Sequence, residues 1–284
     1  MRLSIIVPTY NNIKYLKFFL SSLTKNSKYE HELVIHINNG SDGTIDYISN
    51  NKIKYTYSNE NIGLCSSMNK AFSLTTSNYI LYAHDDMYFC KNWDEFLIDE
   101  IKKQKNNLYY LSGTNVSTRF GLINYDCGSD IENFDEDKFL KFCINDTTPD
   151  LQSSHWAPHL IHRDLWNKIN GFSEEFNPGD GSDPDFCMKL WFNNVRVFKG
   201  ISKFKVYHFN SLTTRNDKVK LNNGTKTFLL KYGFNPKFFR KYYLQGNNSI
   251  IPYKGLLNEP KYNIFMFYEL IINKIKYLFY KIIS

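Results

Sequence analysis

Two short acidic segments and one distant histidine carry the residue types that could do chemistry. They are residues 84–86 (HDD), residues 183–185 (DPD) and His208. Paired carboxylates suit a hard divalent cation such as Mg²⁺ or Mn²⁺, which in turn bridges phosphate oxygens. A histidine added to the set shifts the preference toward Mn²⁺, because imidazole is a softer ligand than carboxylate. A separate carboxylate in a glycine-rich loop is suited to act as a general base.

Each of these signals also has a purely structural interpretation. An Asp-Asp pair is most often a solvated turn or a helix cap, and Asp183 and Asp185 could simply favour the start of a helix through its dipole. His208 follows an aromatic strand and could be an ordinary half-buried histidine. We therefore infer a site from the order of these residues along the chain and from the elements that bring them together.

The first 90 residues predict four strands that alternate with three helices. Apolar runs predict the strands, and apolar residues at helical spacing predict the helices. The expected strands cover residues 3–12, 32–38, 54–58 and 79–83, and the expected helices cover residues 13–25, 44–49 and 64–74. This alternation predicts an α/β fold with a mostly parallel, doubly wound sheet.

Polar residues close three of these strands, at residues 8–11, 38–42 and 84–86. Ligands of doubly wound sheets bind where the strands end, at their carboxyl edge. The sequence therefore predicts a ligand site at this edge.

The pattern is looser after residue 93. We expect helices at residues 94–104, 164–169 and 186–192, strands at residues 109–112, 195–198 and 204–208, and a polar acidic segment at residues 126–150. A glycine-rich loop at residues 171–181 leads into the DPD segment.

The composition excludes several classes of protein. Hydrophobic residues make up 42% of the 284 residues and charged residues 22%, which is typical of a globular chain and not of a disordered one. The five cysteines are odd in number and include no Cys-x-x-Cys pair, so we expect a reducing cytoplasm and no disulfide framework. The apolar run at residues 3–7 is too short for a signal-peptide core.

Four motifs in this order resemble the inverting family 2 glycosyltransferases. They are SIIVPTYN at residues 4–11, NNGSDGT at residues 38–44, HDD at residues 84–86 and the block from Gly171-Phe172 to Asp185. The resemblance implies a GT-A fold, which is a Rossmann-like, nucleotide-binding α/β sheet with a metal-binding Asp-x-Asp element.

The resemblance also implies a division of the chain. It spans residues 3–215, so residues 1–215 are expected to form the glycosyltransferase domain. Within it, residues 1–90 would bind the nucleotide sugar and residues 91–215 would face the acceptor. A basic, aromatic-rich extension then covers residues 216–284.

The nucleotide is assigned by this resemblance to the first half of the domain. Nucleotide-binding roles are implied for Pro8, Thr9, Tyr10, Asn11, Asn38, Asn61, Gly63, Asn69 and Asp85. Two positions depart from the family. Asn38 stands where an Asp commonly bonds the base, and Met68 stands where an Arg is frequent. An amide can both donate and accept, so a uracil base, and hence a UDP-sugar, stays the first expectation but is less firmly specified.

The reacting groups are assigned in the same way. Asp86 and His208 are the implied ligands of Mn²⁺ or Mg²⁺, and Asp183 is the implied general base, with Ser182 in place of the usual Glu. The implied donor and acceptor pocket adds His84, His155, Trp156, Asp185, Ser211 and Arg215, with Thr213 beside them. For His155 and Trp156 an equally supported interpretation is that the Trp belongs to the core and the His to the surface.

The implied reaction is a single displacement on a nucleotide sugar by a hydroxyl of a glycan or glycolipid acceptor. The alternative is a non-catalytic, membrane-associated protein of the same fold that binds nucleotide sugars or glycans, because His84, Asn38 and Ser182 are atypical. Nucleic acid is not an expected partner, since no basic motif lies on a recognisable element.

The C-terminal extension holds most of the positive charge. Residues 216–284 contain 12 Lys and Arg and three Asp and Glu, whereas residues 1–215 contain 23 and 25. Residues 264–283 predict an amphipathic, basic helix. It either lies on an anionic membrane, which would make the protein peripheral on the cytoplasmic face, or packs on protein.

Overall fold

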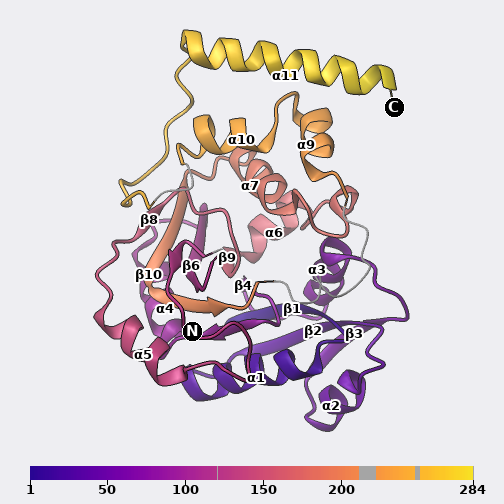
Figure 1. The fold of residues 1–284 in the computed structure, drawn as a ribbon, viewed down its shortest axis with the longest axis vertical. Coiled ribbons are helices and arrows are strands. Elements are labelled where there is room, and N and C mark those ends of the chain that lie inside the picture. The colour runs from indigo at the N-terminus through magenta and orange to yellow at the C-terminus, as the bar shows by residue number, and fades with distance from the viewer. Residues whose placement is uncertain (120, 211–221, 247–249, 284) are drawn as a thin grey trace.

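The computed structural model describes all residues except 120, 211–221, 247–249 and 284. Its described strands form one sheet in the order β3-β2-β1-β4-β9-β6-β10-β5, with β7 paired to β6 and β8 paired to β10 (Figure 1). The strands are β1 (Ser4–Tyr10), β2 (Glu32–Asn38), β3 (Lys54–Ser58), β4 (Tyr79–Tyr82), β5 (Met87–Phe89), β6 (Tyr109–Ser117), β7 (Ile123–Asn124), β8 (Leu151–Gln152), β9 (His159–His162) and β10 (Val197–His208).

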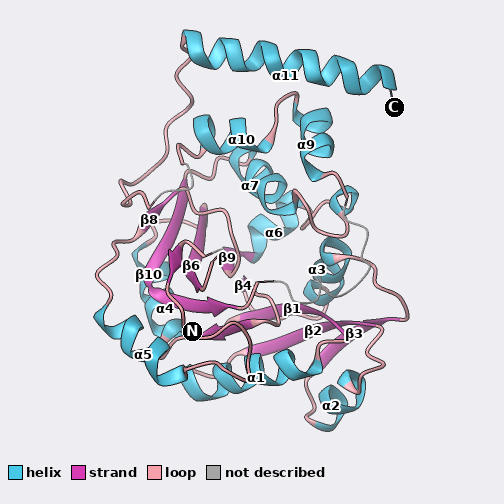
Figure 2. Cartoon of the chain, viewed as in Figure 1, coloured by secondary structure: helices cyan, strands magenta, loops and turns pink. Residues whose placement is uncertain are grey.

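Helices connect these strands and cover the sheet. They are α1 (Ile13–Asn26), α2 (Thr44–Asn50), α3 (Leu64–Phe72), α4 (Trp93–Lys103), α5 (Glu136–Asn145), α6 (Arg163–Ile169), the 3₁₀-helix η1 (Glu174–Phe176), α7 (Ser182–Phe192), α9 (Gly224–Tyr232), α10 (Pro236–Phe238), the π-helix η2 (Phe239–Tyr243) and α11 (Ile264–Ile283). Figure 2 shows α6 and α7 on one side of the strands and α1 on the other.

The predicted mostly parallel sheet is confirmed. Strand β1 is parallel to both β2 and β4, β2 is parallel to β3, and β6 is parallel to β10. Antiparallel pairs involve β9, which lies between β4 and β6, and β5 and β8, which both pair with β10. Because the sheet is covered by helices, the middle of β1 is apolar, and Ile5, Ile6 and Val7 are buried.

The carboxyl edge of the sheet opens between β1 and β4. These strands pair only from Ser4–Ile80 to Ile6–Tyr82, while β1 continues beside β2 as far as Tyr10. After β4 the chain leaves the sheet through residues 83–86. The end of β4 and the last residues of β1 therefore border a space at this edge.

The second half differs from the sequence prediction in several places, and strands β7, β8 and β9 were not predicted. The acidic segment at residues 126–150 contains the helix α5, which Asp135 caps by accepting a hydrogen bond from the backbone N–H of Lys138. The two strands expected at residues 195–198 and 204–208 are one strand, β10, whose register against β6 shifts between Gly200 and Lys205. Helix α7 begins at Ser182, four residues earlier than expected. The predicted C-terminal helix over residues 264–283 is present as α11.

Candidate functional site

A cavity of about 430 Å³ lies at the carboxyl edge of β1, β2 and β4. Of the predicted nucleotide-binding residues, those that line it are Pro8, Thr9, Tyr10, Asn38, Asn61, Gly63 and Asp85. His84, Asp86 and Asp183 line the same cavity. The strand ends therefore meet the acidic segment from the second half of the chain, as the sheet-edge rule predicts.

Two predicted nucleotide residues support the cavity from outside. Asn69 donates a hydrogen bond to the carbonyl of Phe172 and accepts one from its N–H, both 2.9 Å long, so it fixes the loop after α6 against α3. The side-chain amide of Asn11 donates to Asn39, 3.3 Å away, at the rim. Neither residue is among those that line the cavity.

Asn38 lies on the cavity wall, but its amide also holds the wall together. Its Nδ2 donates to the Ser67 hydroxyl at 3.0 Å, and its Oδ1 accepts from the N–H of Ile62 at 3.0 Å. An Asn serves both partners because the amide has a donor and an acceptor. The departure from Asp at this position thus has a structural role in joining β2 to α3 and to the segment before it.

Asp85 is held against β1. Its Oδ2 accepts a hydrogen bond of 2.6 Å from the hydroxyl of Thr9. Burial and the neighbouring Asp86 raise the pKa of the Asp85 carboxyl to about 7, against the effect of the Thr9 hydrogen bond. Two adjacent carboxylates with few compensating charges favour an added cation.

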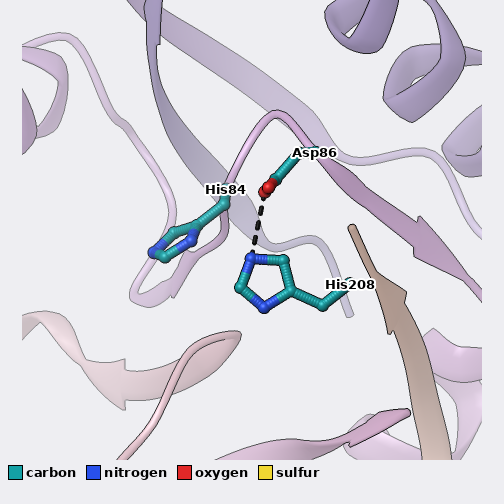
Figure 3. Close-up of side chains that lie close together, drawn as sticks. All are labelled: His84, Asp86 and His208. Carbon is teal, nitrogen blue, oxygen red and sulfur yellow. Dashed lines mark ion pairs between the residues drawn. The ribbon is translucent and has the colours of Figure 1, made fainter. Parts of the chain in front are cut away.

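His84, Asp86 and His208 form one cluster at the floor of this edge. Figure 3 shows His84 and Asp86 on the turn after β4 and His208 at the end of β10, with the ring of His208 facing Asp86. The Nε2 atom of His208 lies 3.1 Å from Oδ1 of Asp86. The other member, His84, places its Nε2 2.6 Å from the hydroxyl of Tyr82.

This cluster fits a divalent cation. One ligand atom from each of the three residues lies within 4.8 Å of the other two. Two imidazoles and a carboxylate suit Mn²⁺ better than Mg²⁺, which prefers oxygen ligands alone. Burial and the nearby His208 lower the pKa of His84 to about 4, so its ring is neutral, the state that binds metals.

The pKa of His208 is shifted in the opposite direction. Burial favours its neutral form, but the carboxylates of Asp86, Asp85 and Asp183 outweigh burial and raise the pKa of His208. The imidazole therefore sits in the negative field of three acids. A cation bound to Asp86 would replace the proton that this field favours on His208.

Asp183 enters the cavity from the first turn of α7. Burial raises the pKa of its carboxyl to about 7, and the nearby His208 acts against this rise. A carboxylate with a pKa near neutrality is a better proton acceptor than an ordinary aspartate, whose pKa is near 4. The geometry therefore allows Asp183 to act as a base on a group inside the cavity.

Three predicted pocket residues lie elsewhere. Asp185 does not line the cavity but accepts a hydrogen bond of 2.7 Å from the hydroxyl of Tyr232, which ties α7 to α9. Nδ1 of His155 lies 2.8 Å from the carbonyl of Ser153, and Trp156 donates to the carbonyl of Gly113 at 2.8 Å. Both side chains are half-buried beside β6 and β10. Ser211, Thr213 and Arg215 lie outside the described residues.

The loop before α7 forms part of the cavity wall, which the sequence did not predict. Pro178, Gly179 and Asp180 of this loop line the cavity, together with Ser182 at the start of α7 and Leu64 of α3. The glycine-rich composition of residues 171–181 was the available signal. Gly63 has φ +82°, and a Cβ there would lie 2.5 Å from Oδ1 of Asn177 in this loop, so the close approach requires glycine.

The model of a family described as "Glycosyl transferase family 2" matches residues 4–200. These residues include Asp86 and Asp183 but not His208. No curated protein matches the chain.

Solved structures of S. aureus TarS have the same fold. TarS 1-349 is 19% identical, with a TM-score of 0.52, over 73% of this chain and 60% of that one. Its complex with UDP is 18% identical, with a TM-score of 0.55, over 82% of this chain and 72% of that one. Its complex with UDP-GlcNAc is 16% identical, with a TM-score of 0.57, over 84% of this chain and 65% of that one. The chain thus spans 60% of the first TarS structure.

Proposed function

The chain belongs to glycosyl transferase family 2, and from that premise we propose that it transfers a sugar from a nucleotide sugar to a hydroxyl group of a glycan or glycolipid. The observation that carries the proposal is the convergence of Asp183 and the cluster of His84, Asp86 and His208 in and around one cavity. The donor we favour is a UDP-sugar, because structures of TarS with UDP and with UDP-GlcNAc share the fold.

Asp183 has the role of the general base in this proposal. Its carboxylate takes the proton of the acceptor hydroxyl while the hydroxyl oxygen bonds to the anomeric carbon. The bond between that carbon and the diphosphate oxygen breaks, and the nucleoside diphosphate leaves with the electron pair. Attack from the face opposite the leaving group inverts the anomeric configuration. The raised pKa of Asp183 suits this proton transfer near neutral pH.

The diphosphate is assigned to the other wall of the cavity. His84, Asp86 and His208 would hold Mn²⁺ or Mg²⁺ there, and the cation would offset negative charge on the departing diphosphate. Thr9 orients Asp85, which lines the same cavity, and its carboxylate would accept a hydrogen bond from a ribose hydroxyl. Asn61 and Gly63 supply the wall beside β2 and α3.

The acceptor is assigned to a second cavity, of about 650 Å³. Its lining includes Phe209 and Asn210, which directly follow His208, and the polar side chains of Asp126, Asn133 and Lys138. Acids, amides and amines that converge on one space suit the hydroxyl groups of a sugar. The reacting hydroxyl of the acceptor would lie beside Asp183 in the first cavity, and the second cavity would hold further sugar units of the acceptor.

Binding and turnover can be measured separately to test the proposal. Calorimetry with UDP, GDP, CDP and dTDP in the presence of Mn²⁺ identifies the nucleobase that the protein prefers. Release of that nucleoside diphosphate from its sugar derivatives, with and without glycan acceptors, then reports transfer or hydrolysis. Selective binding followed by release is expected. Binding without release from any donor would favour the non-catalytic alternative, and absence of nucleotide binding would contradict both.

A further inference from the structure

Helix α11 turns its apolar side away from the rest of the protein. It crosses the end of the molecule beyond α9 and α10 (Figure 1). The side chains of Ile264, Ile275 and Ile282 are 78%, 62% and 84% exposed. In a helix that packs on its own domain the apolar side would face inward. The apolar side of α11 therefore has no cover among the described residues.

The opposite side of α11 is the one that contacts the domain. Met266, Leu270 and Asn273 follow one another at helical spacing, and Met266 and Asn273 are buried. Oδ1 of Asn273 accepts a hydrogen bond of 3.0 Å from the N–H of Asn235, just before α10. Glu269 on the same side accepts from the hydroxyl of Tyr242 at 3.1 Å. Polar bonds thus orient the helix, so its outward side is set by the fold.

The outward side has the layout of an interfacial helix. With about 100° of turn per residue, Tyr268, Ile271, Ile275, Leu278, Phe279 and Ile282 project as one stripe along the axis. Lys274 and Lys281 lie along one border of this stripe, and Lys276 lies along the other. Lysines that border an apolar stripe can reach lipid phosphates while the stripe enters the acyl boundary.

The charge of the C-terminal part of the chain favours one kind of partner for α11 over another. The described residues after 221 carry ten Lys and Arg against two Asp and Glu, so this part of the chain is strongly basic. A second copy would bring equally basic surfaces together, whereas an anionic bilayer has the complementary charge. Among the described residues, no helix is long and apolar enough to cross a membrane.

We propose that α11 docks the protein on an anionic membrane surface, with the stripe of Tyr268, Ile271, Ile275, Leu278, Phe279 and Ile282 in the bilayer interface and Lys274, Lys276 and Lys281 on lipid phosphates. The proposal rests on the exposed stripe, the polar docked side and the charge of the region. It is independent of the donor and of the proposed reaction. Docking in this way would hold the cavity near acceptors carried on lipid.

Vesicle co-sedimentation of the full chain tests the docking. The probes are vesicles of pure phosphatidylcholine and vesicles that also contain phosphatidylglycerol, at low and high salt. The native chain is expected to sediment with the anionic vesicles and to be released by salt. Replacing Lys274, Lys276 and Lys281 together with Gln should weaken binding by about a hundredfold.

A second variant and two matched controls separate docking from folding. Replacing Ile271, Ile275 and Leu278 with Gln should also abolish sedimentation, because it removes the apolar stripe and keeps the charge. The first control replaces three exposed lysines elsewhere with Gln, at Lys52, Lys105 and Lys168. The second control replaces exposed apolar side chains outside α11 with Gln, at Ile144 and Leu256. Both controls should bind as the native chain does. Thermal melting of each variant verifies its fold.

The proposal is overturned if the native chain stays in the supernatant with anionic vesicles, or if the two α11 variants sediment as well as their controls. It is also overturned if light scattering finds a dimer that the apolar variant dissociates while vesicles do not bind. In that case a second copy covers the stripe.

Discussion

The pair of Asp86 and His208 joins the two halves of the site through a contact of 3.1 Å. If this pair and His84 hold the cation, Asp86→Asn should lower the affinity for Mn²⁺ at least about tenfold, because a neutral amide is a weaker ligand than a carboxylate. Calorimetric titration of the protein with Mn²⁺ measures this without any turnover. Asp99→Asn, at an exposed position of α4, is the matched control. If both variants bind Mn²⁺ with the same affinity, Asp86 is not a ligand of the cation.

Glu32 provides a pH-dependent contribution to stability far from the cavity. Its buried carboxylate pairs with Lys54 at 2.6 Å and accepts 2.7 Å and 3.0 Å hydrogen bonds from the N–H and hydroxyl of Thr76. Burial acts to raise its pKa, but these partners and Ser4 outweigh burial and lower the pKa from 4.5 to about 2. Since the folded-state pKa is depressed, the contribution is present above pH 4.5 and is lost as the pH falls toward 2.

The corresponding variant is Glu32→Gln, which should lower the free energy of unfolding by about 2 kcal/mol at pH 7. The difference from the native chain should shrink as the pH falls through this window. Urea denaturation at several pH values measures it, with the exposed Glu60→Gln as control. A difference that stays constant down to pH 3 would show that the charge of Glu32 does not stabilise the fold.

At the scale of elements, the loop before α7 depends on one side chain. Helix α3 follows Gly63, which has no capping side chain, and Asn177 supplies the cap from the loop. Its Oδ1 accepts from the N–H groups of Cys65 and Ser66 at 3.0 and 3.3 Å, and its Nδ2 donates to the Ser66 hydroxyl at 2.7 Å. The N–H of Leu64 donates to the carbonyl of Pro178 at 3.0 Å.

Removing this cap should affect both stability and binding. Asn177→Ala should cost about 1–2 kcal/mol and lower the melting temperature by a few degrees. Because Pro178 and Gly179 line the cavity, the affinity for the nucleotide should fall as well. Thermal melting and calorimetry measure the two effects. Asn51→Ala, which removes an exposed amide bond to the carbonyl of Tyr47 in α2, should leave nucleotide affinity unchanged.

The elements that the sequence predicted well are those with strong periodicity. Strands β2 and β3 and helix α11 have the predicted bounds, because apolar runs or stripes and clear breaks define them. Helix α5 was missed because its acidic and polar residues hide a short amphipathic pattern. The single strand β10 was divided in two because Lys199, Ser202 and Lys203 interrupt its apolar run. Lys199 is satisfied there by Glu100 and Asp150, at 2.8 and 2.9 Å.

The rule that residues close strands at the same edge of the sheet predicted part of the site, and the family resemblance supplied Asp183, Asn61 and Gly63. Asp85, Asp86 and Asn38 meet this condition and line the cavity. The position of His84 as a third member of the metal cluster depends on the conformation of the turn after β4. The residue types do not specify this conformation. The resemblance placed Asp185 in the pocket, but the helix turns its side chain toward Tyr232.

At the scale of the whole molecule, charge and chemistry are separated along the chain. The basic residues 216–284 include α11, while the acids that line the cavity are residues 85, 86, 180 and 183. The net charge of +7 therefore comes from the part of the sequence that includes the helix we assign to a membrane, and the phosphates of the nucleotide would be met locally by the cation. A protein arranged in this way would bind its donor equally well in solution and on a vesicle.

A paired measurement on one variant tests whether Asp183 is the base of a glycosyl transfer. The rate of nucleoside diphosphate release is compared for the native chain and Asp183→Asn, with nucleotide affinity measured in both. We expect the variant to keep its affinity and to lose about 10²–10⁴-fold in rate. An Asp183→Asn variant that binds the nucleotide and releases the diphosphate at the native rate would contradict it.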